Sequence, residues 1–144
     1  MSNQKTLKIK RVFAYTIYSN LRNTPPKDYP TTGEIKSTIS VILPALKEHI
    51  SDYLGTAKKA GEIAEETMSK KITQEESDKK VEELNVIFRQ YNKEHAGDIV
   101  EISLDEEGFN TLKTQFDREN WGKKWVANIE EFGELNDAFT EAGK

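Results

Sequence analysis

The two histidines of the chain lie in segments with the same local pattern. Residues 47–52 and 93–98 both read KEHxxD, and they contain His49 and His95. Because residues three apart share one face of a helix, each segment could offer an imidazole and a carboxylate to a metal ion or to acid–base chemistry. The flanking residues differ, however, and the two histidines are placed differently relative to the neighbouring apolar residues. We therefore predict two separate histidines and no metal site.

Other candidate chemistry is absent from the sequence. Adjacent carboxylates recur at positions 65–66, 75–76, 82–83, 106–107 and 130–131. Neighbours on a helix diverge by about 100°, so these pairs do not face one another as general acid–base catalysis requires. The motifs GxGxxG, GxxxxGK[ST], HExxH and GxSxG do not occur, and there is no cysteine to act as a nucleophile or thiolate ligand. We predict a protein that is not an enzyme and holds no cofactor.

One short segment has the composition of a binding hot spot. Trp121 and Trp125 flank Gly-Lys-Lys, in what we expect to be a connection between helices. Large aromatic side chains beside lysines are typical of residues that anchor a protein partner. The alternative interpretation is a structural cap over the rest of the fold. Both tryptophans are candidate partner-binding residues.

These candidates must be positioned by a mainly α-helical fold with a long antiparallel hairpin. Apolar residues at helical spacing predict a first arm; they are Ile35, Ile39, Ile42, Leu46, Ile50, Tyr53, Leu54, Ala57, Ala64 and Met68. A second stripe predicts the return arm; it consists of Val81, Leu84, Phe88, Tyr91 and His95. Residues 69–73 would form the turn, since Thr73 and Glu76 fit a capping box. Gly97 would end the return arm.

The predicted first arm outreaches its partner. It would begin at the capping box of Thr31 and Glu34, and at 1.5 Å per residue it would span roughly 50 Å against roughly 30 Å for the return arm. Pro44 predicts a kink or a restart of the helix near Leu43. The uncovered part of the first arm is the other candidate surface for a partner. Its apolar residues are Ile35, Ile39 and Ile42.

The remaining segments predict shorter helices and a minor β element in one domain, residues 1–144. Residues 7–22 have the spacing of a helix, although residues 7–12 also alternate like a strand, and residues 23–33 form a proline-rich loop. Residues 98–104 predict a strand that pairs with residues 7–12 or 124–127. Two helices follow, one opened by a capping box at Ser103 and Glu106, the other with Ile129, Phe132, Leu135 and Phe139 inward. We expect residues 1–6 and 140–144 to fray.

Composition and charge narrow the class of partner. No run of 18 apolar residues and no apolar signal segment occurs, so we expect no membrane contact. Residues 1–30 carry six basic residues and one acidic residue, whereas residues 98–144 carry twelve acidic and five basic residues. Such blocks can attract nucleic acid or a basic protein, but attraction between the two ends of the chain is the simpler interpretation. We predict no nucleic-acid partner.

Several segments resemble a family of small uncharacterised proteins of tailed phages and prophages. They are LPALKEHISDY at 43–53, YNKE at 91–94, VEI at 100–102, FNTLK at 109–113 and FGELNDAF at 132–139. The order of these elements is also similar across roughly residues 7 to 142. The resemblance implies a phage origin, a location in the host cytoplasm or the virion, and no known catalytic residues.

Together these observations predict a component that acts by protein contacts. The expected function is a non-enzymatic phage accessory or a virion or assembly subunit, whose uncovered stripe binds copies of itself in a homo-oligomer or binds a structural partner. The alternative is a phage-encoded inhibitor or regulator of a host enzyme or defence complex, which would use the acidic last third of the chain.

Overall fold

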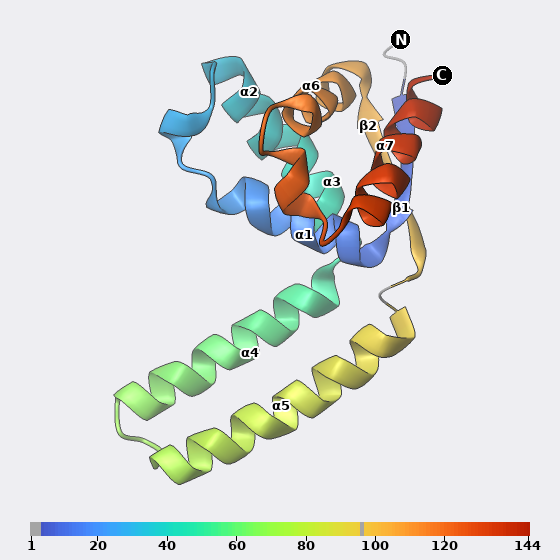
Figure 1. The fold of residues 1–144 in the computed structure, drawn as a ribbon. Coiled ribbons are helices and arrows are strands. Elements are labelled where there is room, and N and C mark those ends of the chain that lie inside the picture. Colours follow the sequence, from blue (N-terminus) through green and yellow to red (C-terminus); the bar gives the residue numbers. More distant parts are fainter. Residues whose placement is uncertain (1–3, 96) are drawn as a thin grey trace. The chain divides into compact units, whose positions relative to one another are not determined.

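A computed structural model describes residues 4–95 and 97–144, and the side chains of residues 52–54 and 57 lie outside that description. The chain divides into two compact units. One, here called the core unit, comprises residues 1–49 and 98–144, and the other, the hairpin unit, comprises residues 50–97. Figure 1 shows the helices and strands of both. The sequence predicts that both units belong to one domain, and this stays a prediction.

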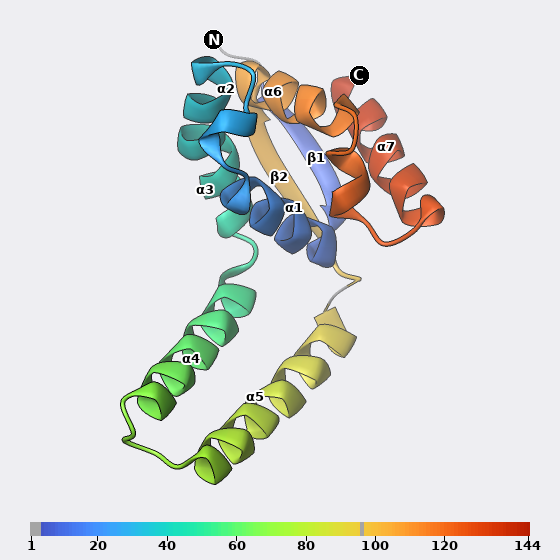
Figure 2. The ribbon, with the colours of Figure 1, turned by 60° about the vertical axis from the view of Figure 1, so that its left-hand side comes forward.

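A two-stranded antiparallel sheet lies at the centre of the core unit. Strand β1 (Gln4–Lys10) pairs with β2 (Ile99–Asp105), and Leu7 lies opposite Ile102. In both strands alternate residues are buried, so the sheet has one dry face and one wet face. Figure 2 shows the strands side by side, with helices packed around them. Of the two pairing partners that the sequence leaves open, the N-terminal segment is the observed one.

Helix α1 (Arg11–Asn23) follows β1 directly. The prediction of a helix over residues 7–22 is therefore wrong for residues 7–10. These residues belong to β1, as the alternative interpretation of their alternating pattern predicted. Residues 4–6, expected to fray, begin this strand. The proline-rich segment contains one short 3₁₀ helix, Pro26–Asp28, before the next helix starts.

Residues 32–47 form three short helical pieces within the core unit. They are α2 (Thr32–Ser37), a π-helical turn (Thr38–Ile42) and α3 (Leu43–Lys47). Thr31 caps α2 by accepting a hydrogen bond from the Glu34 amide at 3.1 Å, as predicted. The restart at Leu43 confirms the effect of Pro44, because proline removes one backbone donor and crowds the preceding turn.

The hairpin unit contains α4 (Ser51–Met68) and α5 (Gln74–His95). The prediction of an antiparallel helical hairpin is confirmed, including its turn at residues 69–73 and the reciprocal capping bonds between Thr73 and Glu76. Its first arm is much shorter than predicted, however. Helix α4 starts only after a non-helical residue, Ile50, so at 1.5 Å per residue the arms measure about 27 and 33 Å. The return arm is the longer one.

The C-terminal part of the core unit contains α6 (Glu106–Asp117), a 3₁₀ helix (Gly122–Trp125) and α7 (Ile129–Gly143). Asp105, and not Ser103, caps α6, because Ser103 lies within β2. Asn128 caps α7 by accepting from the Glu131 amide at 2.9 Å. Helix α7 continues to Gly143, beyond the point where fraying was expected.

The core lies almost wholly in the core unit. Side chains from the sheet, α1, α3, α6 and α7 meet there, and the largest of those fully buried are Leu7, Ile17, Ile42, Leu46, Ile102, Leu104, Leu112, Trp125, Leu135 and Phe139. The described residues of the hairpin unit include only two buried ones, Ile50 and Ser77. The hydrophobic stabilisation of the fold is therefore concentrated in the core unit.

Candidate interaction sites

The two tryptophans of the predicted hot spot have different environments. The Trp125 side chain is 1% exposed, and its ring centroid lies 5.9 Å from that of Phe116. Trp121 is half-buried, with the Tyr29 ring edge-on at 5.3 Å and the Arg118 guanidinium 4.6 Å from its centroid. The structural interpretation thus holds for Trp125, which is part of the core. Only Trp121 has surface left for a partner.

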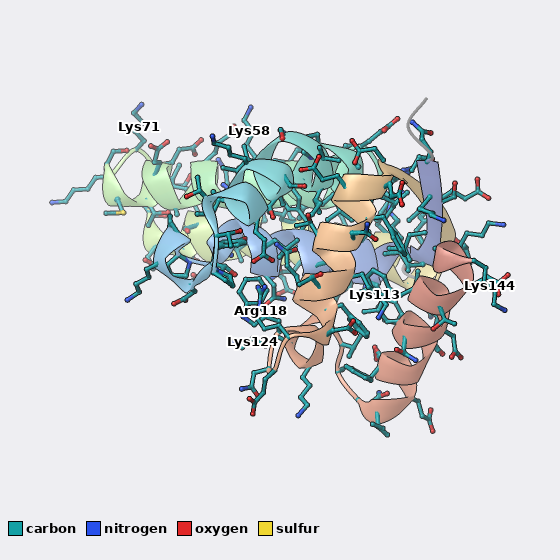
Figure 3. The ribbon with its side chains drawn as sticks, turned by 90° about the horizontal axis from the view of Figure 1, so that it is seen from above. Lys58, Lys71, Lys113, Arg118, Lys124 and Lys144 are labelled. Atoms are coloured by element: carbon teal, nitrogen blue, oxygen red, sulfur yellow. The ribbon has the colours of Figure 1, made fainter. Side chains whose placement is uncertain are left out.

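An ion pair anchors the same region. Nη2 of Arg118 donates to both carboxylate oxygens of Glu34, at 2.8 and 2.9 Å. The Arg118 and Glu34 side chains are 22% and 14% exposed, so solvent screens the pair only in part. Figure 3 labels Arg118 and Lys124 in the connection between α6 and α7. The pair joins the end of α6 to the first turn of α2.

Tyr29 completes this cluster. Its hydroxyl donates to the carbonyl oxygen of Leu21 at 3.0 Å. Burial raises the pKa of the Tyr29 hydroxyl above its ordinary value of 10.0, and the negative charge of Glu34 adds to the rise. The phenol is therefore neutral at physiological pH, so it acts here as a hydrogen-bond donor and aromatic neighbour.

A cleft of about 320 Å³ adjoins Trp121, in the core unit. Its lining combines the indole with polar groups from α1, the following loop and the 3₁₀ helix; these include Asn20, Asn23, Asp28 and Lys124. The Asn20 amide donates to the carbonyl oxygen of Lys124 at 3.2 Å, which ties two sides of the cleft together. The set offers hydrogen-bond donors, acceptors and the surfaces of two indoles, Trp121 and Trp125. The cleft could hold a polar group.

A second hollow, of about 240 Å³, lies at the start of α7. Val126, Ile129 and Phe132 contribute its apolar lining. The sequence predicts Ile129 to face inward, but its side chain is 82% exposed. Ile129 is the first residue of α7, whereas the buried residues of that helix are Leu135 and Phe139, so helical spacing alone does not predict that Ile129 is exposed.

The three isoleucines predicted to bind a partner do not form one open stripe. Ile42 is 0% exposed and belongs to the core, Ile35 is half-buried, and Ile39 is 62% exposed. The premise that this segment extends the hairpin beyond its partner is wrong, because the helix is interrupted before Ser51. Partner binding by Ile39 stays a prediction.

The exposed apolar residues that remain are concentrated on the hairpin unit. Met68 is 85% exposed, Ile87 67%, Val86 53% and Val81 37%. Between the arms, Lys80 of α5 bonds Glu66 of α4 at 3.2 Å, and Ile63, Thr67 and Leu84 are half-buried. Two helices alone cannot cover the apolar residues of both, since each helix has only one side against its neighbour. Sequence periodicity predicts Met68, Val81 and Leu84 as members of the two stripes, but it indicates neither Val86 nor Ile87 and does not predict which residues are exposed.

The two histidines belong to different units, His49 to the core unit and His95 to the hairpin unit. The His95 ring lies 4.6 Å from that of Tyr91. Within residues 4–95 and 97–144, no group of three or more histidine, aspartate or glutamate side chains is placed to hold a metal ion. In the same described part of the chain, no helix is both long and apolar enough to cross a membrane.

Comparison with protein-family models, with curated proteins and with solved structures finds no match to this chain.

Proposed function

We propose that this chain is a non-enzymatic component of a tailed phage or prophage. It is either an accessory protein or a subunit of the virion or of its assembly. It acts through protein–protein contacts, including contacts with its own copies. It would act in the host cytoplasm or the virion. The phage assignment rests on the resemblance of the five segments described above. The mode of action rests on the hairpin unit.

The observation that carries this proposal is the exposure of the apolar side chains on α4 and α5. A soluble helix normally turns its apolar side toward a core, and a single pair of helices gains stability by packing against further helices. In the described part of the hairpin unit, Met68, Val86 and Ile87 are each more than half exposed. Exposed apolar groups gathered on one unit indicate a surface that another protein covers.

Light scattering of the purified chain over a range of concentrations tests the proposal. We expect a mass that rises above the 16.5 kDa of one chain as concentration increases. Replacement of Met68, Val86 and Ile87 by serine should restore the single-chain mass. A matched control replaces Ile99 and Ile129, which are 61% and 82% exposed in the core unit. A single-chain mass at every concentration would contradict self-association.

A second candidate function is inhibition or regulation of a host enzyme or defence complex. It is favoured by the acidic surface of α7, where Glu130, Glu134 and Asp137 are exposed and Glu134 pairs with Lys10 of β1 at 2.9 Å. Such a surface complements a basic groove, and the attraction weakens with salt. Capture of a nucleic-acid-processing host protein that is lost at high salt, and lost again when these three carboxylates are replaced by amides, would favour this function over the first.

A further inference from the structure

Helix α4 has an apolar row that does not face α5. Gly61, Ala64 and Met68 follow one another at spacings of three and four residues, and the sequence continues the row at Leu54 and Ala57, whose side chains lie outside the description. This alternation is the heptad spacing with which one helix packs along another. All three described members of the row are exposed. Positions 61, 64 and 68 are therefore open to packing by a further helix.

The side of α4 that contacts α5 is a different one. Glu66 bonds Lys80, and Ile63 and Thr67 are half-buried on the same side. At about 100° per residue, Ala64 and Met68 are turned from Ile63 by roughly 100° and roughly 140° around the helix axis. A further helix can pack on the row while α5 keeps its place.

Acidic residues predominate in the half of the hairpin nearest its turn, and basic residues predominate in the other half. The half nearest the turn, residues 62–83, carries eight acidic and four basic residues. The half farthest from the turn, residues 50–61 and 84–97, carries two acidic and four basic residues. Two hairpins side by side in the same direction would place like charges together. Two in opposite directions would place the acidic half of each beside the basic half of the other.

Lys58 and Glu65 are two residues of opposite charge that lie along one edge of the row. They are exposed, seven residues apart, and flank the row on the side away from α5. Figure 3 shows Lys58 extending outward from α4. In an antiparallel pair of identical helices centred between positions 61 and 62, Lys58 of each copy lies level with Glu65 of the other. The edge is thus self-complementary about one two-fold axis.

We infer that α4 packs antiparallel on α4 of a second copy, through the row containing Gly61, Ala64 and Met68, with Lys58 of each chain paired to Glu65 of the other. This inference rests on the proposed function and specifies its geometry. Glycine and alanine let the two helices approach closely, near the lower end of the usual 8–10 Å between axes. An 18-residue helix is about 27 Å long, so this contact is smaller than the standard interface of about 800 Å² per partner, and the dimer dissociates on dilution.

Charge reversal tests the pairing. Lys58→Glu and Glu65→Lys should each raise the dissociation constant of the dimer about ten-fold, because each creates two repulsive pairs per dimer. The double variant should return to the wild-type value, and an equal mixture of the two single variants should form a mixed dimer. Lys59→Glu and Glu62→Lys are the matched controls, since they make the same change of charge on other sides of α4.

Cross-linking tests the axis independently, because the natural chain has no cysteine. Gly61→Cys should form a disulfide-linked dimer on mild oxidation, since position 61 lies next to the axis. Met68→Cys, in the same row, should not, because in the antiparallel pair its two copies lie about 20 Å apart. Efficient cross-linking at position 68 but not at 61 would overturn the antiparallel arrangement.

The charge-reversal, cross-linking and light-scattering results together distinguish a failure of the α4 pairing from a failure of self-association. An oligomer that is indifferent to Lys58 and Glu65 and does not cross-link at position 61 overturns the α4 pairing and leaves self-association standing. A chain that remains a monomer at all concentrations overturns the α4 pairing and also the self-association in the proposed function.

Discussion

Arg118, the residue that follows α6, holds Glu34 in the first turn of α2 with two hydrogen bonds from one nitrogen, at 2.8 and 2.9 Å. The two residues are 84 positions apart in the chain. The guanidinium also lies 4.6 Å from the centroid of the Trp121 ring. This pair fixes the first turn of α2 against the connection that contains the tryptophans.

Loss of either partner should destabilise the fold. We expect Arg118→Met or Glu34→Gln to lower the free energy of unfolding by about 1–3 kcal/mol, because each leaves a mostly buried charge without its counterpart. Urea denaturation of both single variants and the double variant measures the coupling. If the two single effects simply add, the pair contributes no interaction energy of its own.

The buried pair Thr38 and Gln115 should respond differently. The Gln115 side chain is 0% exposed, its Nε2 donates to Oγ1 of Thr38 at 2.9 Å, and its Oε1 has no partner among the described residues. Thr38→Val should cost about 1–3 kcal/mol, since it leaves the amide donor buried and unpaired. Adding Gln115→Leu should recover most of that loss in thermal and urea unfolding. A double variant that is less stable than Thr38→Val would contradict this account.

Gly122 should not tolerate a side chain. A Cβ there would lie 2.5 Å from the carbonyl oxygen of Phe116, which is backbone and cannot move aside cheaply. We expect Gly122→Ala to destabilise the chain by about 1–3 kcal/mol. Gly133→Ala is the control, because a Cβ at this position in α7 meets no atom within 4 Å. It should stabilise the chain by about 0.5–1 kcal/mol, as alanine is the better helix former. Melting temperatures that fall in both variants would disprove the steric explanation.

Tyr29 should contribute to the loss of stability at high pH. Its pKa is raised in the folded chain above the ordinary 10.0, first by burial and then by Glu34. The unfolded chain therefore loses this proton first, so the contribution is intact below pH 10.0 and is lost as pH rises through the folded-state pKa. Unfolding free energies measured between about pH 9 and 11 should fall less steeply for Tyr29→Phe than for the natural chain. Equal slopes would exclude a role for Tyr29.

Local signals in the sequence predicted the elements that short-range interactions specify. Both bonds of the Thr73 and Glu76 capping box are present, and Thr31 caps α2. The helix restarts at Leu43 as Pro44 required. In each case the controlling interaction spans no more than four residues, so the local residue types suffice.

The candidate site was less predictable. The residue types at positions 121–125 indicate Trp121 and Trp125 as candidate binding residues. Sequence spacing does not predict that Trp125 is buried in the core or that Trp121 lies beside Arg118 and Tyr29. The cleft beside Trp121 also draws on α1 and the following loop, about a hundred residues earlier. No local pattern relates such distant segments.

Apolar periodicity and capping act over a few residues, so local residue types are enough to predict a mainly helical chain with a hairpin and a minor β element. The position where the long stripe breaks depends instead on packing between distant segments. Ile42, Leu46 and Ile50 continue one helical spacing and all three are fully buried, yet α3 ends at Lys47 and α4 begins only at Ser51. Tertiary burial outweighs the continuity of one helix there, and the exposed apolar residues of the hairpin unit are left on α4 and α5.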